Sequence, residues 1–481
     1  MTGPRCGPVR RGARVAAGLV AAVALALPAG CGDDTPAAGP VTTAPTAGPA
    51  GATDQAPLGT TTAGDPPTTT TDGPGRLVDA TAGSGLDDAL LGIRGHAAAV
   101  ADINGDGWDD LFVGTFADRD REDYRARGAD GPAPDRLLLG SADGFVVDPD
   151  FPGRLGRTAG AAFADLDGDG DPDLVVSRNV RDGDRQDAPS EVYRNDGGHL
   201  VPATVLDTVR GGRDVAILDV DRDGRPDLVV VEDRWSGGET AVLRNLGGLR
   251  FAGPGDGFGW PGEVTGLGVA VTDLDLDGRP DLVVGGDNRW FLGTGDGFVE
   301  GAPALAWPRR GDEDDPALVT PADLDGDPAT PDAVIVGQHF NSVVDTGVGE
   351  PFRIYQPMVT GADGDVTMVE VTAAAGIPAL TTKSPRVVAL DLTGDGRPEL
   401  VTTASVGGVD DRRPIVLTAG DPTDGPGGVP HYSPADGIGG DHYWVEAVVL
   451  DANGDHRPDV FFVEWEPSEP SRLFLNLPAD P

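Results

Sequence analysis

The chain has 481 residues, including 73 glycines and 43 prolines, and its formal net charge is -43 at pH 7. Such an acidic surface argues against electrostatic binding to nucleic acids or to anionic membranes. Its two cysteines, Cys6 and Cys31, both lie near the N-terminus, so neither a disulfide framework nor a zinc site can hold the rest of the chain together.

The first segment has the features of a secretory signal. Four arginines in the first fourteen residues precede an apolar run over 15–27, which is too short for an ordinary membrane span. The stretch "LPAGC", which ends at Cys31, resembles the lipobox of bacterial lipoproteins, although Pro28 stands where that motif prefers Leu. The resemblance implies a signal peptide over 1–31 and lipidation of Cys31. The alternative is cleavage at an Ala-x-Ala-like site, with Cys31 left as a free thiol.

Residues 32–75 are rich in Thr, Pro, Ala and Gly and contain almost no large apolar residue. Such a composition cannot bury enough surface to offset the entropy of ordering, so we expect a disordered, fairly extended linker. The sequence therefore predicts an extracytoplasmic protein that is tethered to the membrane only through a lipid, or is otherwise secreted.

An acidic phrase then recurs seven times. Its copies begin at Asp102, Asp165, Asp219, Asp273, Asp323, Asp391 and Asp451, as in "DLDGDGDPDLVVS" and "DVDRDGRPDLVVV". The intervals between successive copies are 63, 54, 54, 50, 68 and 60 residues. Self-similarity at this spacing indicates a repeat architecture.

Within each phrase, acidic or amide residues occupy positions 1, 3, 5 and 9, and Gly usually occupies position 6. Alternate residues of a tight loop can direct carboxylates at one hard cation such as calcium, and the carbonyl of position 7 can add a further oxygen. We therefore predict several structural calcium ions. The predicted ligands in the first four loops are Asp102, Asn104, Asp106, Trp108 and Asp110; Asp165, Asp167, Asp169, Asp171 and Asp173; Asp219, Asp221, Asp223, Arg225 and Asp227; and Asp273, Asp275, Asp277, Arg279 and Asp281.

The last three loops depart from this pattern, and we expect them to bind calcium less well. Pro328 replaces Gly in loop 5, Thr393 replaces an acid in loop 6, and His456 replaces Gly in loop 7. Their predicted ligands are Asp323, Asp325, Asp327 and Asp332; Asp391, Asp395 and Glu399; and Asp451, Asn453, Asp455 and Asp459. The alternative for any single loop is a polar turn without metal.

The flanks of the loops exclude an EF-hand. An EF-hand needs a bidentate Glu at position 12 and a helix on each side. Position 12 is Val113, Val176 and Val230 in the first three loops, and apolar β-branched runs typical of buried strands follow. Each loop therefore joins two strands.

A Gly-rich hairpin follows each of these pairs, as in "SEVYRNDGGHLV" and "RWFLGTGDGFVE". Four strands repeated seven times predict an all-β, seven-bladed β-propeller over 76–481. The last repeat stops after its third strand. We therefore predict that the N-terminal strand closes the ring, with Leu77 and Val78 beside the strand around 473–475.

The phrase D-x-[DN]-x-D-G-x-x-D-L after a strand resembles the FG-GAP and VCBS repeats, which also form the head of integrin α chains. The resemblance spans roughly 76–478 and implies a propeller with calcium loops. The Phe-Gly and Gly-Ala-Pro elements are mostly absent, with "VVGG" or "LFVG" instead, so the chain is more similar to the bacterial FG-GAP-like group. No integrin-like partner domain is implied.

Function is less constrained. No HExxH, Gly-x-Ser-x-Gly or phosphate loop is present, and we expect the histidines at loops or strand ends and most tryptophans in packing. The insertions "TFADRDREDYRARGADGPAP" and 341–351 are the candidate binding surfaces. We predict a monomeric, non-enzymatic module that recognises a protein or a glycan. The alternatives are a hydrolase or lyase with its site in the central channel, and a purely structural envelope protein.

Overall fold

The structure is a computed structural model. It describes residues 76–179, 188–206, 212–233, 237–253, 258–307, 316–325, 333–338, 352–360, 365–378, 386–403, 414–422, 428–435, 438 and 442–478. All of them belong to the second of the two units into which the chain divides, 56–481. Within the described residues, no helix is long and apolar enough to cross a bilayer. The predicted signal segment with Cys31, and the linker, lie outside these residues.

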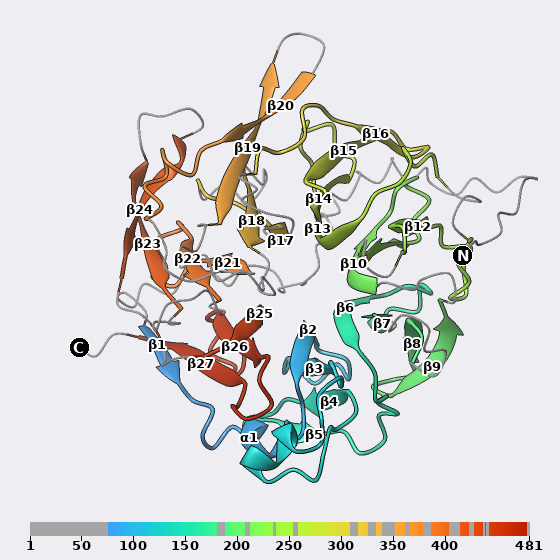
Figure 1. The fold of residues 1–481 in the computed structure, drawn as a ribbon, viewed down its shortest axis with the longest axis vertical. Helices are drawn as coiled ribbons and strands as arrows, with labels where there is room; N and C mark the ends of the chain where they lie inside the picture. The colour runs from blue at the N-terminus through green and yellow to red at the C-terminus, as the bar shows by residue number, and fades with distance from the viewer. Residues whose placement is uncertain are drawn as a thin grey trace, which may run out of the picture. The chain divides into compact units, whose positions relative to one another are not determined.

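Seven antiparallel sheets are arranged in a ring, so the predicted seven-bladed β-propeller is confirmed (Figure 1). In each blade the strand that precedes the acidic loop lies nearest the axis of the ring and the strands that follow it lie progressively further out, with β1 as the outermost strand of the last blade. The seven inner strands are β2, β6, β10, β13, β17, β21 and β25.

The first four blades follow one another along the chain. Blade 1 contains β2 (Gly95–Ala101), β3 (Asp110–Thr115), β4 (Arg136–Leu139) and β5 (Val146–Val147). Blade 2 contains β6 (Thr158–Ala164), β7 (Asp173–Arg178), β8 (Glu191–Asn195) and β9 (Leu200–Val205). Blade 3 contains β10 (Gly212–Leu218), β11 (Asp227–Glu232) and β12 (Ala241–Leu243). Blade 4 contains β13 (Gly266–Thr272), β14 (Asp281–Gly286), β15 (Arg289–Gly293) and β16 (Phe298–Glu300).

The remaining blades complete the ring. Blade 5 contains β17 (Pro316–Ala322), β18 (Ala333–Gln338), β19 (Arg353–Thr360) and β20 (Asp365–Glu370). Blade 6 contains β21 (Val387–Leu390), β22 (Glu399–Thr402), β23 (Val416–Pro422) and β24 (Pro430–Pro434). Blade 7 contains β25 (Trp444–Leu450), β26 (Asp459–Glu464), β27 (Arg472–Leu477) and β1 (Arg76–Asp79). The described helices are α1 (Leu86–Ala89) and the 3-10 helix η1 (Asp123–Arg127).

Blade 3 differs from the four-stranded prediction. Its sheet has three strands within the described residues, and a single bridge between Asn245 and Phe251 occupies the place of the fourth. The turn between them contains Gly247 and Gly248, both with positive φ, so the chain reverses tightly there but does not extend the ladder.

The second strand of each blade is buried on both faces because it lies between neighbouring blades. The runs "DLVVVE" of β11 and "DVFFVE" of β26 are buried at every position. Apolar side chains from each pair of adjacent blades form a shared cluster; Phe112 of β3 and Leu174 of β7, for example, belong to one such cluster. The core of the domain therefore consists of the blade interfaces, which is why continuous rather than alternating apolar runs specify it.

The N-terminal strand closes the ring as predicted. β1 pairs antiparallel with β27, and Leu77 lies opposite Asn476 and Val78 opposite Leu475. Beyond the ladder, the Ala80 amide donates to the Leu473 carbonyl at 2.9 Å. Segments nearly 400 residues apart in the sequence thus form one sheet.

Removal of β1 should destabilise the whole ring. Each lost ladder bond contributes about 1 kcal/mol, and the edge of β27 becomes exposed. We expect a chain that begins at Ala82 to melt at least about 5 °C below one that begins at Gly73, as followed by circular dichroism. Equal melting temperatures would contradict a closing role for β1.

Candidate metal-binding loops

The seven acidic phrases join the first and second strands of the blades, and those that are described share one local structure. The carboxylate at position 1 accepts backbone N–H groups from inside its own loop. Asp102 accepts from Gly105 at 2.8 Å, Asp106 at 3.1 Å and Gly107 at 2.9 Å. Asp165, Asp219, Asp273, Asp391 and Asp451 accept in the same way. This carboxylate therefore shapes the loop whether or not an ion is bound.

The acid at position 9 is buried and joins the loop to the third strand. In blade 4, Asp281 accepts the Leu274 amide at 2.7 Å with one oxygen and the Gly293 amide at 2.7 Å with the other. The equivalent acids are at most 2% exposed and are Asp110, Asp173, Asp227, Glu399 and Asp459. Each accepts the position 2 amide in the same manner.

Burial raises the pKa of these position 9 acids, and it outweighs the backbone hydrogen bonds that oppose it. The pKa is raised to about 8 for Asp281, to about 7 for Asp227 and to about 6 for Asp173. The other acids of each loop raise it further by repulsion. A cation placed among these carboxylates would relieve both causes at once.

In loops 2, 3 and 4 the acids at positions 1, 3 and 9 converge. Each group offers three carboxylate oxygens within 4.8 Å of one another, a separation that suits oxygens around one calcium ion. The groups are Asp165, Asp167 and Asp173; Asp219, Asp221 and Asp227; and Asp273, Asp275 and Asp281. One oxygen of Asp167 and one of Asp221 are buried without a hydrogen-bond partner. A buried, unpaired carboxylate oxygen is costly unless a cation meets it, so these residues fit a hard metal ion.

Position 5 does not join these groups. Asp169, Asp223 and Asp277 are exposed, and each accepts the position 7 amide of its own loop. In loops 3 and 4 the position 7 arginine also forms an ion pair with the position 5 acid. The predicted position 7 ligands would act through their backbone carbonyls, and their side chains serve other contacts.

The remaining loops differ in what the structure brings together. In loop 1, Asn104 occupies position 3, and Trp108 packs toward Gly454 of loop 7. In loop 5, Asp323 and Asp325 are described, whereas Asp327 and Asp332 lie outside the described residues. Loops 6 and 7 keep the position 1 and position 9 contacts, and Arg397 pairs with Asp395.

Neighbouring loops are linked by contacts that were not predicted from the sequence. The Asn195 side chain donates to the Ile103 carbonyl of loop 1 at 2.8 Å, and the Asn245 side chain donates to the Leu166 carbonyl of loop 2 at 2.8 Å. Asp109 accepts the Asp451 amide at 2.7 Å, which links loop 1 to loop 7. The recurring Arg-Asn, which ends the third strand in "VYRN" and directly follows it in "VLRN", was the available signal.

Most described aromatic residues serve packing. Trp290, Trp444 and Trp465 are buried. His96 stacks on Phe116 with ring centroids 5.0 Å apart, and burial lowers its pKa to about 3. His339 and Trp235 lie outside the described residues.

The blade 1 insertion forms a hollow at the end of the blade opposite its metal loop, because it follows β3 rather than β2. The hollow has a volume of about 610 Å³ and is lined by Leu91, Arg121, Gly128, Ala129, Asp130, Gly131, Pro132 and Leu155. Leu155 is 53% exposed. The second predicted insertion, 341–351, lies outside the described residues.

Comparisons with known proteins agree with the repeat structure. Residues 219–284 and 273–329 match the model of the FG-GAP-like repeat, and residues 94–121 match that of the FG-GAP repeat. No curated protein matches the chain significantly.

Two solved structures with similar folds share little sequence identity with this chain. A structure titled BBS1N in complex with ARL6DN shares 14% identity and covers 85% of this chain and 98% of its own, with a TM-score of 0.46. Rhamnogalacturonan lyase YesW shares 15% identity and covers 80% of this chain and 72% of its own, with a TM-score of 0.39.

Loss of a position 9 acid should cost far more stability than loss of a position 5 acid. Asp281→Ala leaves two buried amides without an acceptor, at about 1–3 kcal/mol each. We expect its melting temperature in chelator to fall by roughly 5 °C or more, whereas that of Asp277→Ala should change little. Equal losses in the two variants would contradict the pinning role of position 9.

Proposed function

Because the chain carries FG-GAP repeats on a seven-bladed β-propeller, we propose that it is a calcium-stabilised recognition module that binds a protein or a glycan without catalysing a reaction. The observation that carries the metal part is the convergence of three carboxylates in each of three successive blades. The unpaired buried oxygens of Asp167 and Asp221 support it independently. All the donors are oxygens, which suits calcium rather than zinc.

Calcium would act on the fold through strands that the loops already connect. In each of these loops, the acids at positions 1 and 3 lie on the connection between two strands, and the acid at position 9 contacts the third. A bound ion would therefore hold three strands of one blade together. The hydrogen bonds that Asn195 and Asn245 donate to the neighbouring loop would then connect that blade to the next one. Its charge would also offset part of the net charge of -43.

The recognition part of the proposal is placed on the blade 1 insertion. Its hollow combines the exposed Leu155 with Arg121 and backbone groups, a mixture that suits a polar ligand with an apolar face. The predicted lipid anchor and linker would hold such a surface away from a membrane. The protein would then act outside the cytoplasm and as a monomer.

The enzymatic alternative lacks a specific observation. The described residues that line the central channel include no histidine, cysteine or serine, and their polar side chains are those of Asp214, Thr320, Arg386 and Glu446. We therefore keep the non-enzymatic proposal.

Calcium should raise the melting temperature of a chain that begins at Gly73. Binding to the native state alone stabilises it by about 2.7 kcal/mol at one hundred times Kd, and several sites add. We expect calorimetry to count at least three ions and the triple variant Asp167→Asn, Asp221→Asn, Asp275→Asn to lose most of the shift. The exposed variant Asp143→Asn is the control. No shift in the unmodified chain would refute the metal assignment.

Ligand binding should depend on the blade 1 hollow. We would screen glycan and protein arrays in saturating calcium, and then compare Leu155→Asp with Val299→Asp, which alters an equally exposed apolar residue of blade 4. We expect the first substitution to weaken binding of any hit at least about tenfold, the equivalent of 1.4 kcal/mol, and the second to leave it unchanged. Hits that are insensitive to Leu155→Asp would place recognition elsewhere.

A further inference from the structure

The central channel contains charged residues that neither the metal loops nor the blade 1 hollow uses. They occupy one equivalent place in the repeat, five residues before the first acid of each loop. Around the ring, this place is occupied by Ala97, Gly160, Asp214, Gly268, Leu318, Arg386 and Glu446. Three blades thus contribute charge, whereas the others contribute small or apolar residues.

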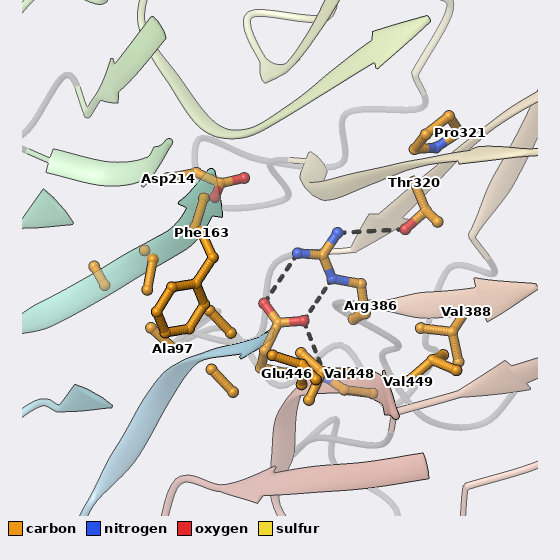
Figure 2. Close-up of a pocket in the computed structure, with 18 of the residues that line it drawn as sticks. Ala97, Phe163, Asp214, Thr320, Pro321, Arg386, Val388, Glu446, Val448 and Val449 are labelled. Carbon is orange, nitrogen blue, oxygen red and sulfur yellow. Dashed lines mark hydrogen bonds and ion pairs between the residues drawn. The ribbon is translucent and has the colours of Figure 1, made fainter. Parts of the chain in front are cut away.

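Arg386 and Glu446 satisfy each other. The Arg386 Nε donates to Glu446 at 2.6 Å and its Nη2 donates to the other carboxylate oxygen at 3.0 Å, which makes a bidentate pair (Figure 2). The remaining Arg386 nitrogen donates to the Val319 carbonyl at 3.1 Å. Because its donors are engaged and its charge is balanced by Glu446, Arg386 is not available to hold an anion.

Asp214 is the third charged residue at this place in the repeat, and its charge is not balanced by the pair of Arg386 and Glu446. It is 7% exposed, and its two oxygens accept the amides of Val215 at 2.9 Å and Val269 at 3.1 Å. Within the described residues, no salt bridge joins it to a basic side chain. Figure 2 shows its carboxylate facing the space that Arg386 and Glu446 border from the other side.

That space is a cavity of about 270 Å³. Its other wall is apolar, because β2 and β6 contribute Ala97, Ala161 and Phe163. Gly160 has no side chain to separate β6 from β10; a Cβ there would lie 2.7 Å from the Asp214 Cα. The cavity therefore has one apolar side and one side with a net charge of -1, from two carboxylates and one guanidinium.

An occupant must match both walls. A divalent metal ion prefers six or more oxygen ligands, which a cavity walled by alanines does not supply. An ammonium group meets a buried carboxylate directly, and a short aliphatic body covers the alanines and Phe163. Burial raises the pKa of Asp214 to about 6, with Arg386 lowering it and Glu446 raising it, so the carboxylate is mostly ionised at neutral pH.

We propose that the central channel is a binding site for an alkylammonium group, with Asp214 as its counter-ion and the alanine wall of β2 and β6 as its apolar contact. The group could belong to a small free amine or to a lysine side chain of another protein. This site is separate from the calcium loops and from the blade 1 hollow.

The test is calorimetric titration of the calcium-saturated chain from Gly73 to Pro481 with n-butylammonium, at pH 7.5 and physiological ionic strength. 1-Butanol and butyrate are the matched neutral and anionic probes. We expect n-butylammonium to bind at least tenfold more tightly than either, and its affinity to fall at pH 5, where Asp214 takes up a proton. The charged groups that face Asp214 across the cavity are Arg386 and Glu446, which form a bidentate pair with each other.

Two variants assign the binding. Asp214→Asn should weaken n-butylammonium at least tenfold, and Ala161→Leu, which fills the cavity without touching a charge, should do the same. Asp143→Asn controls for the general acidity of the surface and should leave binding unchanged. If Asp214→Asn does not fold, Ala161→Leu still decides.

The outcomes separate cleanly. If blocked lysine (N-acetyl-lysine methylamide) binds as well as n-butylammonium, the ammonium group that the site takes belongs to a lysine side chain of another protein. If blocked lysine does not bind, the ligand is a small free amine. Absence of binding, equal binding of 1-butanol, or binding that survives both Asp214→Asn and Ala161→Leu would overturn the proposal. None of these results depends on whether calcium raises the melting temperature or whether the blade 1 hollow binds a ligand.

Discussion

The blades depend on one buried carboxylate. At position 9 of the described loops, a buried acid accepts a hydrogen bond from a backbone amide of its own loop. In most blades it also accepts one from an amide near the end of the third strand. Asp281, with Leu274 on one side and Gly293 on the other, is the clearest case. An apolar residue there would leave two buried donors unsatisfied, so the acid contributes substantially to the stability of the blade. Its cost is the desolvation that raises its pKa.

This arrangement separates two roles that the acidic phrase combines. Positions 1 and 9 organise the backbone, as the contacts in loops 1, 2, 3, 4, 6 and 7 show. Position 3 is the variable member: an aspartate with an orphaned oxygen in loops 2 and 3, an asparagine in loops 1 and 7, and a threonine in loop 6. Position 3 therefore varies among the loops, whereas positions 1 and 9, which organise the backbone, are acidic in loops 1, 2, 3, 4, 6 and 7.

Much of the fold could be predicted from the sequence, because the repeat fixes strand order and the continuous apolar runs fix which strand lies between blades. Ring closure by Leu77 and Val78 followed from counting strands. The spacing of the acids did not indicate that position 5 is exposed and accepts the position 7 amide of its own loop. The single bridge of blade 3 and the Asn195 and Asn245 links depend on tertiary contacts. The charged residues of the channel could have been predicted, because an alignment of the repeats on their first acid places Asp214, Arg386 and Glu446 at the same position.

Closure of the ring by β1 also sets an order of events during synthesis. β1 emerges from the ribosome first, yet its partner β27 is among the last segments made, so the edge of β1 stays unpaired while six blades form. Contacts between residues so far apart in sequence are slow to form, and an exposed strand edge can pair with another chain in the meantime. β1 has only four residues, from Arg76 to Asp79, with a charge at each end. Such a short, charged strand is a poor template for association, so the chain can carry its closing strand from the start with little risk of aggregation.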